Sequence, residues 1–99
     1  MNQNKRVVVV GRRQDNLDRV TRLLEGAGYI VTSTTNDGVA IDMVSNSAYS
    51  ALLVDGEVSQ SDRLHIITEA RNQNATMAVL TIHSPQSVLT QLSQTVLPS

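Results

Sequence analysis

Val7-Val8-Val9-Val10 is a run of four consecutive β-branched residues, and it decides the class of fold. A short, continuous apolar run is typical of a strand that is buried on both faces, as in a parallel sheet. The apolar residues that follow it recur at helical spacing: Leu17, Val20, Leu24 and Ala27. With Asp15 as the N-cap and Gly26 and Gly28 as the stop, they predict a helix over 15–26.

The alternation of strand and helix patterns continues along the rest of the chain. Further β-branched or apolar runs predict strands at 29–34, 51–54 and 77–82. Segments that start with capping residues predict helices that open at Asn36–Asp37, at Asp62 and at Ser84–Pro85. Whether Thr95–Leu97 forms a further short strand stays open at this point. Strands that alternate with helices predict right-handed βαβ units and a parallel α/β sheet.

Composition narrows the class of protein. The chain has 99 residues, which fits a single domain over 1–99, and its net charge is -1. A chain with this net charge does not offer the basic surface that is typical of nucleic-acid-binding proteins, so no direct nucleic-acid contact is expected. The absence of cysteine excludes disulfides and thiolate metal sites. No apolar run approaches the roughly 18 residues of a membrane span, and no signal peptide is recognisable, so we expect a cytoplasmic protein.

Ligand sites in parallel sheets lie beyond the carboxyl ends of the strands, which directs attention to the residues that follow each predicted strand. Leu52-Leu53-Val54-Asp55 resembles the third strand and phosphoacceptor aspartate of the receiver domains of bacterial two-component response regulators. The segment 14–31 is similar to the first helix and second strand of that family, and Leu80-Thr81 to its fourth strand. The resemblance covers about residues 5–98. It implies a flavodoxin-like sheet with helices on both faces, with Asp55 at the phosphoacceptor position and Thr81 at the switch position.

Departures from the receiver pattern decide what the resemblance implies about function. Gly11 and Arg12 stand where receivers carry the two acids that hold Mg²⁺ together with the phosphoacceptor. Leu97 stands where receivers carry the lysine that contacts the phosphoryl group. The fifth helix of the family is missing, and the fifth strand is short or absent. We therefore expect no metal, no cofactor and no enzymatic activity.

These departures predict a phosphorylation-independent pseudo-receiver, a regulatory module for protein contacts in bacterial signalling or transcription control. Without a fifth helix, one face of the sheet should be partly uncovered, and an exposed apolar patch usually marks an interface. That argument favours a homodimer or a tight protein partner. Whether the 99 residues are a whole protein or the first domain of a longer regulator stays open.

Several readings of the same residues stay open beside this one. Asp55 could still be phosphorylated, could be paired with Arg12 across the strand ends, or could cap the turn at Gly56. Thr81 could be only a strand residue. Arg12 and Arg13, with His83 nearby, could instead bind an anion or a nucleotide phosphate, although no glycine-rich phosphate loop follows the first strand.

Overall fold

A computed structural model describes residues 5–45, 49–75, 77–82, 87, 88 and 90. The described residues form four strands: β1 (Arg6–Val10), β2 (Ile30–Thr34), β3 (Tyr49–Asp55) and β4 (Ala78–Ile82). They also form three helices: α1 (Gln14–Gly26), α2 (Asp37–Val44) and α3 (Gln60–Gln73). None of these helices is long and apolar enough to span a bilayer, within the part of the chain that is described.

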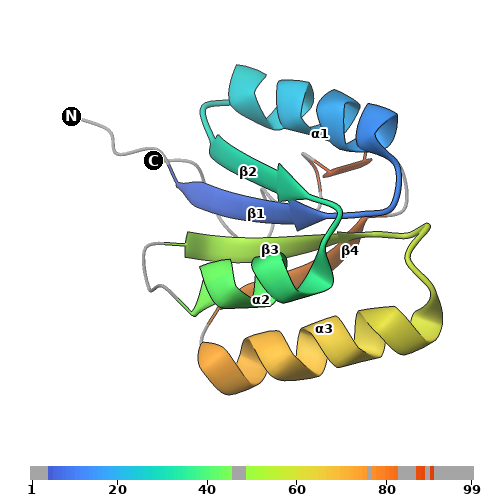
Figure 1. Cartoon of the computed structure of the whole chain (residues 1–99). Coiled ribbons are helices and arrows are strands. Elements are labelled where there is room, and N and C mark those ends of the chain that lie inside the picture. The colour runs from blue at the N-terminus through green and yellow to red at the C-terminus, as the bar shows by residue number, and fades with distance from the viewer. Residues whose placement is uncertain (1–4, 46–48, 76, 83–86, 89, 91–99) are drawn as a thin grey trace.

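The sheet is parallel throughout, with the strand order β2-β1-β3-β4. In Figure 1, α1 covers one face of this sheet, and α2 and α3 cover the other. The predicted flavodoxin-like α/β fold is therefore confirmed. Because the strands are parallel, their carboxyl ends meet at a single edge, on the right of Figure 1, and the connections to all three helices leave from there.

The valine run of β1 fills the centre of the molecule. Val7 and Val9 are fully buried on the α1 face, and Val8 and Val10 are fully buried on the opposite face. Each buried valine contributes about 1.5–3 kcal/mol relative to an exposed one. The continuous apolar run is thus explained by two separate cores, one on each side of the same strand.

The expectation of a partly uncovered sheet face is wrong over β1 and β3. The apolar residues of both strands from Val7 to Val10 and from Ala51 to Val54 are 0% exposed. Val88, which follows β4, packs into the α1-face core with Val7, Val9 and Leu17. Among the described residues, the exposed large apolar side chains lie on three different elements; they are Ile30, Val39 and Leu64. They form no single apolar patch over the sheet.

Two of the predicted helix caps are also wrong. Arg13, not Asp15, precedes α1, and its side chain makes no capping hydrogen bond, while Asp15 lies in the first turn. Ser59, not Asp62, caps α3 by accepting a hydrogen bond from the backbone nitrogen of Asp62 at 3.3 Å. The Asp62 carboxylate is left available for a contact outside its own helix.

The remaining predicted boundaries agree with the structure to within one or two residues at most ends. Asn36 caps α2 as predicted, because its Oδ1 accepts from the backbone nitrogen of Val39 at 3.0 Å. Strand β3 is longer than the predicted 51–54, since it begins at Tyr49. The predicted helix start at Ser84–Pro85 and the strand at Thr95–Leu97 lie outside the described residues.

The connection from α1 to β2 is a glycine-dependent helix stop. Gly28 has a φ of 99°, a left-handed conformation that favours glycine. The backbone nitrogens of Gly28 and Tyr29 donate to the carbonyls of Glu25 and Leu24, both at 3.1 Å. This pair of bonds is a Schellman motif, and it places Tyr29 against Leu24 in the α1-face core.

We expect Gly28→Ala to destabilise the fold by about 1–2 kcal/mol, because an L side chain disfavours the left-handed region. No heavy atom lies within 4 Å of an added Cβ at Gly28 or at Gly26, so neither substitution creates a steric clash. Gly26→Ala is the matched control, at a helical position where alanine stabilises by up to about 1 kcal/mol. Thermal unfolding measures both. Equal shifts in the two variants would contradict the assignment of the stop to Gly28.

Candidate functional site

The candidate site is the carboxyl edge of the sheet, where the residues after β1 meet the first turns of two helices. Arg12 follows β1, Asp37 begins α2, and Asp62 lies in the first turn of α3. Their places in the sequence are far apart, and the parallel sheet brings them together. The fold therefore gathers one cation and two carboxylates at this edge.

The guanidinium of Arg12 donates hydrogen bonds to three residues. Its Nη1 and Nη2 donate to Oδ1 and Oδ2 of Asp37 at 2.7 Å and 2.9 Å, a bidentate pair. Nη2 also donates to Oδ2 of Asp62 at 2.9 Å, and Nη1 to the carbonyl of Thr35 at 3.3 Å. The fixed fork of a guanidinium suits such multiple acceptors, which the ammonium group of lysine would not match.

We call Arg12 with its two acceptors, Asp37 and Asp62, the Arg12 clamp. Its ion pairs shift the pKa values of Arg12 and Asp62. The hydrogen bonds that Arg12 donates to Asp37 and, secondly, to Asp62 raise the pKa of Arg12. The hydrogen bond from Arg12, followed by the one from Ser59, lowers the pKa of Asp62. The side chains of Arg12, Asp37 and Asp62 are 34%, 24% and 51% exposed. Solvent weakens each pair, so the clamp stabilises through its bidentate geometry and shared partner more than through any single contact.

A second arginine extends the clamp into a network. Arg13 pairs with Asp15 at 2.9 Å and lies 3.7 Å from Glu57, and Asn16 donates to the same Glu57 carboxylate. The Asp15 hydrogen bond raises the pKa of Arg13, and the Arg13 hydrogen bond lowers the pKa of Asp15. We call the set the carboxyl-edge network; its members are Arg12, Arg13, Asp15, Asn16, Asp37, Glu57 and Asp62.

Asp55 is not part of this network, so the predicted pairing of Asp55 with Arg12 is wrong. Arg12 pairs instead with Asp37 and Asp62. Oδ1 of Asp55 accepts from the backbone nitrogen of Glu57 at 3.2 Å, and the carbonyl of Asp55 accepts from Val58 at 3.0 Å. The alternative in which Asp55 caps the turn at Gly56 agrees with these contacts.

The second oxygen of Asp55 is enclosed beside Gly11. Among the described residues, Oδ2 of Asp55 is buried and has no hydrogen-bond partner. A Cβ added at Gly11 would lie 3.0 Å from the Asp55 Cβ, 3.0 Å from Leu17 Cδ2 and 3.2 Å from Asp55 Oδ2. The position where the receiver family carries an acid is therefore filled by Asp55 and Leu17. A side chain at this position would require Asp55 or Leu17 to shift by a few tenths of an ångström.

The other predicted site residues lie apart from Asp55 or outside the described residues. Thr81 pairs with Val54 in the β3–β4 register, one residue before Asp55. Side chains alternate along a strand, so Thr81 follows Val79 on the face of α2 and α3, while Asp55 follows Leu53 on the face of α1. His83 and Leu97 lie outside the described residues. Within the described part, no cluster of three or more acidic or histidine side chains could hold a metal ion.

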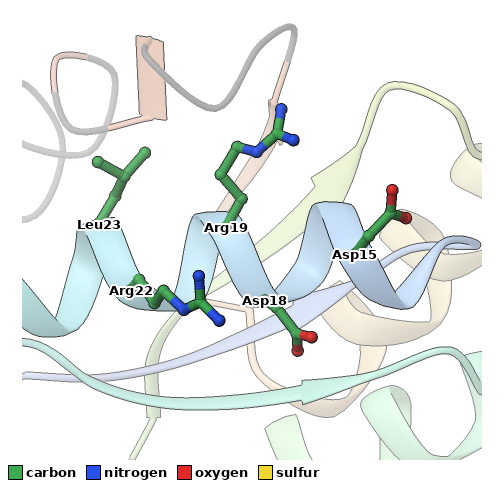
Figure 2. Close-up of a pocket in the computed structure, with 5 residues that line it drawn as sticks. All are labelled: Asp15, Asp18, Arg19, Arg22 and Leu23. Carbon is green, nitrogen blue, oxygen red and sulfur yellow. The ribbon is translucent and has the colours of Figure 1, made fainter.

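Sequence reasoning missed the partners of Arg12. Asp37 and Asp62 were interpreted only as helix openings, although both follow carboxyl ends of strands. The signal that could have found them is an arginine at an edge that also carries acids at two helix starts. A surface hollow lies elsewhere, along α1 (Figure 2), and is lined by Asp15, Asp18, Arg19, Arg22 and Leu23.

Comparison with known proteins identifies the fold. The sequence matches no family model and no curated protein. An adenylate cyclase structure from Rhodopirellula baltica superposes with a TM-score of 0.69 at 21% identity, covering 92% of this chain and 67% of that one. A putative pilus assembly-related protein from Burkholderia pseudomallei gives a TM-score of 0.64 at 20% identity, over 90% of this chain and 71% of that one. These similarities establish a flavodoxin-like, receiver-type fold and nothing finer.

We expect the fold to lose stability on acidification partly through Asp62. Its pKa is lowered in the folded state, so its contribution is present above the unfolded value of 3.8 and is lost as the pH falls through the lower folded value. Asp62→Asn should therefore flatten the decline in melting temperature below about pH 5. Asp42→Asn, an exposed α2 change outside the network, is the control. Parallel pH profiles for Asp62→Asn and the unsubstituted chain would refute the clamp.

We expect Gly11→Ala to destabilise the fold by about 1–3 kcal/mol, because the new Cβ overpacks against Asp55 and Leu17. The tip of Leu17 can move, whereas the Asp55 Cβ is fixed to the end of β3. Denaturant unfolding measures the loss. In an Asp55→Gly background the same substitution should cost less, because two of the three close contacts, those with Asp55 Cβ and Oδ2, are gone. An equal cost in both backgrounds would show that Asp55 does not limit the space at Gly11.

Proposed function

We propose that this chain is a receiver-like module that works without phosphorylation, through contact with a protein partner, in bacterial signalling or transcription control. The packing of Gly11 against Asp55 carries this proposal. A receiver needs acids beside its phosphoacceptor, and here the nearest position is a glycine at which an added Cβ would lie only 3.0 Å from the Asp55 Cβ. The proposal includes no metal, no cofactor and no catalytic residue.

The chemistry of phosphoryl transfer supports the same conclusion. Mg²⁺ prefers several oxygen ligands, and it neutralises the charge that develops on the transferred group. Asp55 offers one oxygen that already accepts a hydrogen bond and another that is buried. Arg12 supplies a permanent positive charge at this edge, but its partners are Asp37 and Asp62. We infer that the Arg12 clamp holds the segments that lead from β1, β2 and β3 into their helices in one conformation.

The contacts of the arginines weigh against an anion or nucleotide sensor at Arg12 and Arg13. Both guanidinium groups are already paired, and the two arginines face four carboxylates. An incoming phosphate would have to displace a carboxylate and would meet an excess of negative charge. The contribution of His83 to such a site lies outside the described residues.

The test is incubation of the chain with acetyl phosphate and Mg²⁺, followed by intact-mass spectrometry. We expect no phosphoryl adduct on this chain under conditions that label a conventional receiver domain run in parallel. The physical reason is that the site lacks both the ligands for the ion and access to the second oxygen of Asp55. Asp55→Asn serves as the matched variant.

A phosphoryl adduct that is absent in Asp55→Asn would overturn the proposal and restore the reading of Asp55 as a phosphoacceptor. An adduct that persists in Asp55→Asn would place the modification on another residue and leave Asp55 unmodified, as proposed. Isothermal titration with Mg²⁺ alone gives a second readout, for which we expect no binding heat attributable to Asp55.

A further inference from the structure

Strand β2 lies at the end of the sheet and offers unpaired backbone groups. Ile30 donates to the carbonyl of Lys5 at 2.9 Å, and Gly11 donates to the carbonyl of Thr34 at 3.2 Å. Bonding alternates along a parallel strand, so Ile30, Thr32 and Thr34 face β1 with their backbone groups. Val31 and Ser33 therefore direct their N–H and C=O groups outward. Among the described residues, neither makes a further backbone bond outside the sheet.

The sequence of this edge favours pairing with another strand. Ile30-Val31-Thr32-Ser33-Thr34 consists of residues with β preference or small polar side chains, without a charge or a proline. Its register with β1 is continuous over all five residues, so no bulge twists it away. Charged residues, prolines and bulges are the usual protection of an edge strand, and none is present here.

We propose that the β2 edge binds the β2 edge of a second copy of this chain, in antiparallel register about Thr32. Val31 of one copy then lies opposite Ser33 of the other, and the outward groups form four backbone hydrogen bonds across a two-fold axis. Thr32 meets its own copy at the centre. This inference rests on the proposed function, since it names the partner and the surface of that contact module.

Charges on α1 support a second copy rather than an unrelated strand. Helix α1 packs more extensively on β2 than on β1. In Figure 2, Asp18 projects from α1 toward β2, and Leu23 projects from the opposite side. Arg22 is exposed and lies four residues after Asp18, on the same face of the helix. Leu23 packs against the α1-face core, so the side with Asp18 faces the open edge.

The two-fold axis makes these charges self-complementary. Asp18 and Arg22 are one helical turn apart and lie symmetrically about the middle of α1 (Gln14–Gly26). The axis reverses the helix of the second copy, so Asp18 of each copy comes to the level of Arg22 of the other. Among the described residues, Arg22 makes no ion pair, and the Asp18 carboxylate accepts only from Gln14 Nε2, at 2.9 Å. Both are available for such a pair.

Light scattering and sedimentation equilibrium on the 99-residue chain test the interface. We expect a dimer that becomes a monomer in Ser33→Pro, which removes an outward N–H and leaves the bonds to β1 intact. Asp18→Arg and Arg22→Asp should each raise the dissociation constant about tenfold or more, and the double exchange should restore it. Circular dichroism confirms that each variant is folded, and all three positions tolerate change without loss of a buried side chain.

The contrary outcomes are specific. A monomer at all concentrations would overturn the inference, as would a dimer that withstands both Ser33→Pro and the charge reversals. Amide hydrogen exchange gives an independent readout for the case in which Ser33→Pro unfolds the chain: Val31 and Ser33 should be protected only in the dimer. The test with acetyl phosphate on Asp55 measures the proposed function independently of this interface. A monomer that also resists phosphorylation would therefore refute the interface and leave the proposed function standing.

Discussion

Burial of β1 on both faces is the constraint on which the rest of the structure depends. The strand lies between β2 and β3, and its valines contact α1 on one side and α2 and α3 on the other. A strand held in this way cannot shift its register by one residue without exchanging its two faces, and both faces are occupied. The positions of Gly11 and Arg12 at its end are fixed as a consequence. The chemistry of the carboxyl edge therefore follows from packing at the centre of the sheet.

Gly11 and Arg12 act on that edge in complementary ways. Gly11 lies against the Asp55 side chain, since a Cβ at this position would lie 3.0 Å from the Asp55 Cβ. Arg12 places a permanent positive charge at the same edge, where Asp37 and Asp62 bind its guanidinium.

The fold was predictable from the sequence because it depends on periodicity, and the site was not, because it depends on choices among acids. Four valines followed by Leu17, Val20 and Leu24 predict a strand and a helix whatever lies around them. Asp15 and Asp62 each suit an N-cap, yet both are ion-paired with arginines instead. Arg12 had one predicted partner, Asp55, and in the folded chain it pairs with two other acids, Asp37 and Asp62. Only the distances between elements decide that pairing, and they are a tertiary property.

The carboxyl edge runs across the ends of the strands, whereas the β2 edge runs along the side of one strand, so the two regions face different directions. The two-fold axis of the proposed dimer reverses the strand direction, so the carboxyl-edge networks of the two copies would lie at opposite ends of a continuous sheet. Helix α1 begins next to Arg13 and carries Asp18 and Arg22 further along, so it is the element that adjoins both regions. Its buried stripe, Leu17, Val20 and Leu24, anchors it to the core independently of either. Loss of the Arg12 clamp and loss of the β2 contact should therefore be nearly additive, since distant sites without shared partners are independent.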